Sequence, residues 1–93
     1  MRIIGQIEHP SLKISVFKNE GRTSVKFETA HYEQTYKLGD DERFATLEGV
    51  KQFVDNALIE RTLEIFRQMH STRLDVMARL YPVQAGEVFE NII

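Results

Sequence analysis

The first 38 residues alternate between apolar and polar side chains, and this pattern constrains the fold more than any other feature of the chain. Four runs show the alternation: residues 2–8, 12–18, 23–29 and 32–38. The segments that separate them are His9-Pro10, residues 19–22, which include Gly21, and Ala30-His31, which contains neither glycine nor proline. A period of two is typical of strands that bury one face, and short turns between such runs indicate hairpins. The pattern therefore predicts a four-stranded antiparallel meander over residues 2–38.

The three predicted hairpins agree on which face of the sheet is buried. Two-residue loops at His9-Pro10 and Ala30-His31, with a turn of two or four residues around Glu20-Gly21, align apolar residues across neighbouring strands. The predicted layers are Ile3, Val16, Val25 and Tyr36, then Gly5, Ile14, Phe27 and Gln34, then Ile7, Leu12, Thr29 and Tyr32. A slip of one residue would destroy this agreement. The reverse face is polar and mildly basic, with Ile4 and Phe17 as its apolar members.

After residue 46 the apolar residues recur at helical spacing instead. Thr46 is a favourable N-cap, and Glu48 suits the first turn of a helix. We expect helices over about 47–56 and 57–81, the second ending at Tyr81-Pro82 because the residue before a proline disfavours helical backbone. The spacing does not decide whether this helix breaks near His70. The predicted fold class is α+β, a single domain over residues 1–93 in which C-terminal helices cover one face of the meander.

The second helix is too long for the sheet that it covers. A helix over residues 56–81 is about 39 Å long, whereas strands of seven residues span about 23 Å. Its last turns would extend beyond the sheet with apolar side chains uncovered. A break near His70, a C-terminal tail (residues 82–93) that folds back, or a second copy of the chain would each solve this problem.

We favour a homodimer, in which the apolar tail is available to dock on the partner chain. The interface predicted for it contains these residues: Phe66, His70, Leu74, Met77, Leu80, Tyr81 and Phe89.

Composition and charge exclude several classes of protein. The chain has no cysteine, which rules out disulfides and thiolate metal sites and suits a reducing cytoplasm. No run of apolar residues is long enough to cross a membrane. With 12 basic and 14 acidic residues, the net charge of −2 does not attract nucleic acid to the chain as a whole. We expect a cytoplasmic protein.

No constellation of side chains predicts a catalytic, cofactor or metal site. His9, His31 and His70 lack metal-ligand spacing, and the acidic residues 40–42 lack the order of a calcium loop. Glu28 and Glu33 should lie close together on the reverse face, where Lys13 and Lys26 can pair with them.

Three functions remain open. The leading one is a small non-enzymatic interaction or assembly domain that acts as a homo-oligomer, with an unidentified protein partner also open. The alternative is a module that binds single-stranded nucleic acid through the exposed sheet face, with these residues: Lys13, Phe17, Lys26 and Lys37. The second alternative is a small enzyme or ligand-binding domain without a recognisable motif.

Overall fold

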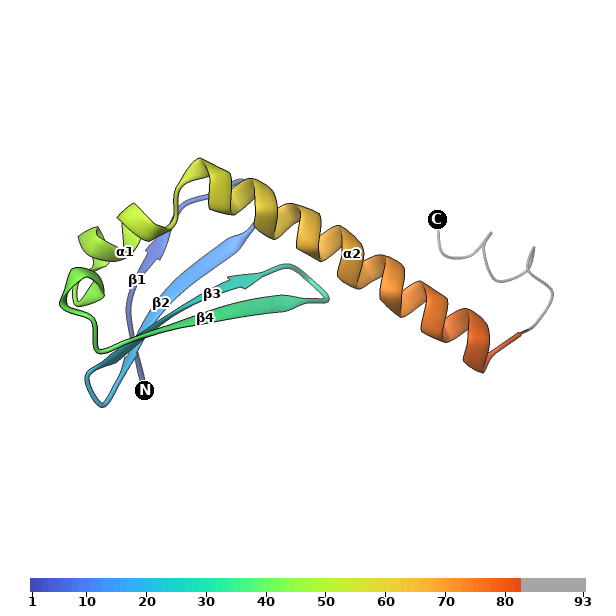
Figure 1. Ribbon diagram of the computed structural model, residues 1–93, viewed down its shortest axis with the longest axis horizontal. Helices are drawn as coiled ribbons and strands as arrows, with labels where there is room; N and C mark the ends of the chain where they lie inside the picture. Colours follow the sequence, from blue (N-terminus) through green and yellow to red (C-terminus); the bar gives the residue numbers. More distant parts are fainter. Residues whose placement is uncertain (83–93) are drawn as a thin grey trace.

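The computed structural model describes residues 1–82 and contains a four-stranded antiparallel sheet followed by helices (Figure 1). The strands are β1 (Arg2–Ile7), β2 (Lys13–Asn19), β3 (Arg22–Glu28) and β4 (Glu33–Gly39). A 3-10 helix η1 (Glu42–Phe44) precedes the helices α1 (Leu47–Phe53) and α2 (Asn56–Leu80). The strands lie in the order β1-β2-β3-β4. The predicted meander and the α+β class are therefore confirmed, and the tail after Pro82 lies outside the described residues.

The register predicted for β2, β3 and β4 is confirmed. Val25 pairs with Val16 on one side and with Tyr36 on the other. Glu20 and Gly21 form the turn between β2 and β3 with φ angles of 53° and 79°, both positive as a tight type I′ hairpin requires. The turn between β3 and β4 is also a two-residue loop, closed by a hydrogen bond of 2.9 Å from the Thr29 N–H to the Tyr32 carbonyl.

The register predicted for β1 is wrong. Ile3 pairs with Phe17 instead of Val16, and Gly5 pairs with Val16 instead of Ile14. Ile3 therefore lies on the reverse face, where it is 56% exposed. The loop after β1 spans residues 8–12 rather than two residues, and the register shifts between Ile3 and Gly5. Such a bulge inserts one unpaired residue, which alternation alone does not reveal; Ile4 consequently packs against the core.

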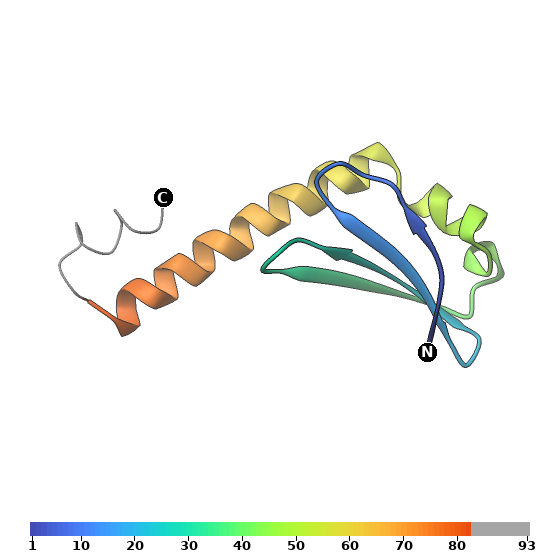
Figure 2. The same ribbon diagram turned by 180° about the vertical axis from the view of Figure 1, so that it is seen from behind.

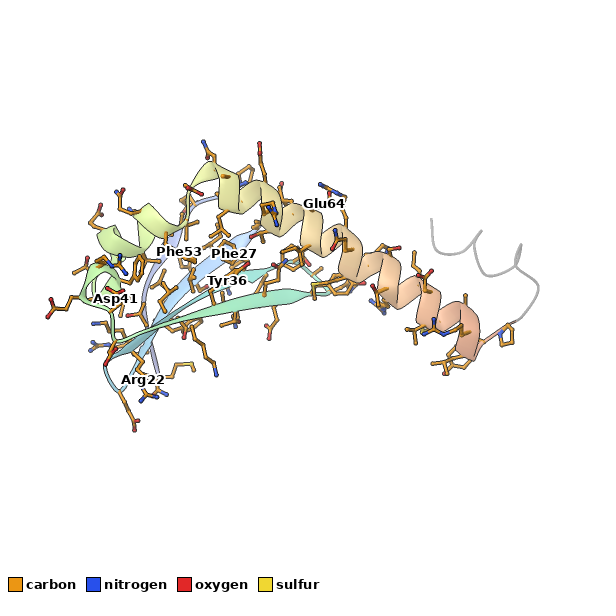
Figure 3. The ribbon with its side chains drawn as sticks, viewed as in Figure 1. Arg22, Phe27, Tyr36, Asp41, Phe53 and Glu64 are labelled. Atoms are coloured by element: carbon orange, nitrogen blue, oxygen red, sulfur yellow. The ribbon has the colours of Figure 1, made fainter. Side chains whose placement is uncertain are left out.

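The helices cover the apolar face of the sheet. The core consists of four strand residues, two helix residues, Leu12 from the loop before β2 and Val54 at the end of α1: Leu12, Ile14, Val16, Val25, Phe27, Val50, Val54 and Phe66. Figure 3 shows Phe27, Tyr36 and Phe53 together between the sheet and α1. Their rings meet edge to face, with centroids 6.1 Å apart for Phe27 and Tyr36 and 5.7 Å apart for Tyr36 and Phe53. This geometry is favourable for aromatic pairs.

Side-chain caps set the start of each helix. The hydroxyl of Thr46 accepts a hydrogen bond from the Gly49 N–H, as the sequence predicts. The first helix ends at Phe53 rather than near residue 56. Asp55 then caps α2 by accepting a bond of 2.8 Å from the Leu58 N–H. The second helix therefore begins at Asn56, one residue before the predicted start.

Helix α2 is continuous over 25 residues and does not break near His70. At 1.5 Å per residue it is about 37 Å long, and it runs past the tip of the β3–β4 hairpin (Figures 1 and 2). The described molecule is correspondingly elongated, with extents of 54 × 25 × 17 Å and a radius of gyration of 17.1 Å. A compact domain of this length would have a radius of gyration of about 12 Å.

The contact between Gly5 and Leu47 is a testable feature of this packing. A Cβ atom at Gly5 would lie 2.6 Å from Cδ2 of Leu47, so the leucine side chain would have to move. We expect Gly5→Ala to lower the free energy of unfolding by about 1–3 kcal/mol. Adding Leu47→Ala removes the clash, so the double variant should lose less than the sum of the single losses in urea unfolding. Additive losses would contradict this contact.

A candidate interaction surface on the second helix

The first half of α2 is anchored to the sheet. Thr62 and Phe66 are buried, and Ile59 and Leu63 pack against the core. The side-chain amide of Gln34 on β4 donates a hydrogen bond of 3.0 Å to the Thr62 carbonyl. Apolar burial and this polar contact together fix the direction in which the helix leaves the sheet.

The tip of the β3–β4 hairpin contacts the middle of α2. The hydroxyl of Tyr32 lies 2.9 Å from Nδ1 of His70, and the two rings meet edge to face with centroids 5.9 Å apart. A shallow hollow lies beside this contact, lined by Tyr32, Ile65, Gln68, Met69, Thr72 and Arg73. Met69 is the most C-terminal residue of α2 that packs against the core within the described part of the chain.

Beyond this point lies the projecting segment, defined here as residues 74–80 of α2. Met77 and Leu80 are 45% and 63% exposed, and Tyr81, which follows directly, is 62% exposed. Residues at spacings of three and four share one side of a helix. Met77 and Leu80 therefore continue the side on which Phe66 faces the core, but no element of residues 1–82 packs against them.

The predicted interface residues fall into three groups in the structure. Phe66 lies in the core of its own chain, and His70 contacts Tyr32. The remaining described members lie on or next to the projecting segment: Leu74, Met77, Leu80 and Tyr81. Phe89 lies outside the described residues.

The four residues of the predicted nucleic-acid face share the reverse side of the sheet: Lys13, Phe17, Lys26 and Lys37. The ammonium of Lys26 lies 5.2 Å from the centroid of the Phe17 ring. The same ammonium lies 3.4 Å from Glu28 and 3.9 Å from Glu33, so the ion pairs expected of Lys26 form, whereas Lys13 makes no ion pair within residues 1–82. Lys26 thus already covers the ring and shares its charge with two carboxylates.

Sequence reasoning missed two residues that shape these surfaces. Ile3 joins Phe17 on the reverse face because of the bulge in β1. Tyr32 was expected only as a core residue, whereas its hydroxyl also reaches His70 on α2. Tyr32 and His70 are 38 positions apart in the sequence, and no local pattern indicates their contact.

Within residues 1–82, no three His, Asp or Glu side chains gather as a metal site would require. No helix in this part of the chain is both long and apolar enough to cross a membrane.

Comparisons with protein-family models, with curated proteins and with solved structures find no match.

An acidic segment follows β4 and contains one strongly perturbed carboxyl group. Asp41 caps η1 by accepting a hydrogen bond of 2.9 Å from the Arg43 N–H, and the Arg43 guanidinium donates further bonds to both of its oxygens. These side-chain hydrogen bonds lower the pKa of Asp41 from 3.8 to about 2. Because the folded pKa is lowered, the interaction stabilises the fold above pH 3.8 and is lost as the pH falls toward 2.

We expect the NMR titration of the Asp41 carboxyl to have its midpoint near 2. In Arg43→Gln the midpoint should rise toward 3.8, because the guanidinium donors are gone. Equal midpoints in the parent and the variant would contradict this assignment.

Proposed function

We propose that the protein is a small, non-enzymatic assembly domain that acts as a homodimer, with the projecting segment of α2 in its interface. The observation that carries this proposal is the continuity of α2 beyond the sheet, with Met77, Leu80 and Tyr81 exposed along it. The proposed setting is the cytoplasm, which suits a chain without cysteine.

Helix stability supports a partner for the projecting segment. Isolated helices shorter than about 12–15 residues are marginal in water, because most helical stability in proteins comes from packing of an apolar face. Residues 74–80 make about two turns beyond the hairpin, and their apolar side lacks such packing within the described chain. A covering surface would stabilise these turns and remove Met77 and Leu80 from water.

A second copy of the chain could supply the surface that covers the apolar side of the projecting segment. The continuity of α2 removes a break near His70 as a way to shorten the helix. A symmetric dimer buries the same surface on both copies, so the exposed apolar residues of α2 would be covered in both chains.

The proposal predicts a concentration-dependent dimer. Sedimentation velocity should give a mass near twice 10.8 kDa at micromolar concentration. Leu80→Glu places a charge in the proposed interface and should shift the equilibrium at least about tenfold toward monomer, since burying an unpaired charge is costly.

Asp75→Lys is the control. At 100° per residue, position 75 lies at least 100° around the helix from Leu74, Met77, Leu80 and Tyr81, so a change of charge there should leave the mass unchanged. A parent chain that stays monomeric at all concentrations would contradict the proposal. Equal effects of the two variants would remove α2 from the interface.

A further inference from the structure

Strand β4 is an edge of the sheet. It is the last strand in the order β1-β2-β3-β4, and its pairing with β3 is regular from Glu33 to Lys37, before a register shift at Leu38. The other edge strand, β1, carries a bulge, and α1 lies against it. Proteins usually disrupt free edges with bulges, prolines or covering elements, because such edges readily pair with another strand. Residues 33–37 contain no proline and no bulge.

The register shows which backbone groups of β4 face outward. Thr29 and Tyr32 share a backbone hydrogen bond of 2.9 Å, and such pairs alternate with non-bonded pairs along an antiparallel ladder. Gln34 and Tyr36 therefore direct their N–H and C=O groups toward β3. The backbone groups of Glu33, Thr35 and Lys37 point away from the sheet, and the side chains of all three residues are exposed.

We infer that β4 pairs antiparallel with β4 of a second copy, with Thr35 opposite the partner's Thr35, which would create a continuous eight-stranded sheet. This inference rests on the proposed homodimer and names the centre of its interface. In this register all three outward residues form hydrogen-bonded pairs, which gives about six backbone hydrogen bonds between the copies. A shift of the partner strand by two residues in either direction keeps the same hydrogen-bonding phase but loses one of these three pairs.

The side chains of β4 complement each other in the same register. Glu33 lies opposite the partner's Lys37, and Lys37 lies opposite the partner's Glu33. Directly opposed charges of opposite sign stabilise antiparallel strands, as do threonine pairs. Lys37 forms no ion pair within residues 1–82, and Glu33 makes only the contact of 3.9 Å with Lys26. Both charges are therefore available to a partner.

The pairing also accounts for the projecting segment of α2. Helix α2 leaves the sheet beside the β3–β4 tip, close to the Glu33 end of β4 (Figure 1). Antiparallel pairing brings the C-terminal end of the partner's β4 to this point, followed by the partner's acidic residues 40–42. Arg73, just before the projecting segment, lies on the same side of α2 as Met77 and Leu80. Stable interfaces bury about 800 Å² per partner, so we assign the edge strand and the helix to one interface.

A charge swap tests the β4 register. Glu33→Lys and Lys37→Glu each replace two favourable pairs by two repulsive ones, so each should raise the dimer dissociation constant at least about tenfold. The double variant restores opposite charges at both positions and should return the dissociation constant to within about threefold of the parent value. Lys13→Glu is the matched control, because it makes the same change on the same face of the interior strand β2. It should leave the dissociation constant unchanged.

Single cysteines provide a second readout that does not depend on charge. Paired residues in hydrogen-bonded positions have Cα atoms about 5.5 Å apart, within the range of a disulfide. The chain has no cysteine of its own, so Thr35→Cys should form a covalent dimer under mild oxidation. Lys37→Cys is on the same edge, but the two copies of residue 37 would lie about 14 Å apart and should not cross-link.

The outcomes separate the two proposals. Cross-linking at position 35 with restoration in the charge swap supports the β4 pairing. A dimeric parent with no selective cross-link at position 35 and no effect of either single charge change would overturn the β4 pairing and leave the assembly proposal standing. A parent that is monomeric throughout would overturn both.

Discussion

The mismatch in length between α2 and the sheet is the constraint on which the rest of the structure depends. Strands of seven residues reach about 23 Å, whereas 25 helical residues reach about 37 Å. The helix is anchored at its first half by Phe66 and by the bond from Gln34 to the Thr62 carbonyl. Its second half must therefore leave the sheet, and it does so at the β3–β4 tip with apolar side chains exposed.

Tight turns explain why most of the sheet could be predicted from the sequence. Two-residue loops at Glu20-Gly21 and Ala30-His31 leave one register for each hairpin, and alternation then aligns Val16, Val25 and Tyr36. The register of the first hairpin was not predicted correctly, because its loop is longer than two residues and β1 contains a bulge. Neither feature is visible in the alternation of apolar and polar residues. Leu12 is apolar and buried although it lies in the loop, so composition did not reveal where β2 begins.

The candidate interaction surface was predictable in part. Helical spacing is enough to place Met77 and Leu80 on one side of α2, and strand length is enough to show that they extend beyond the sheet. The position of Phe66 inside the core depends on where α2 crosses the sheet, which spacing alone does not specify. The outward hydrogen-bonding groups of β4 were not predicted, although the two-residue loop at Ala30-His31, which sets their phase, was. The spacing of Glu33, Thr35 and Lys37 around a common centre was the available signal.

The most direct test of the account asks whether a second copy completes the fold. Amide hydrogen exchange, followed by NMR at low and high protein concentration, reports on both proposed parts of the interface. If a second copy covers β4 and α2, the amides of Glu33, Thr35 and Lys37, and those of the projecting segment, become more protected as the protein concentration rises. Gln34 and Tyr36, which bond to β3 within one chain, should show a smaller change. Exchange that is independent of concentration at all of these amides would contradict the account.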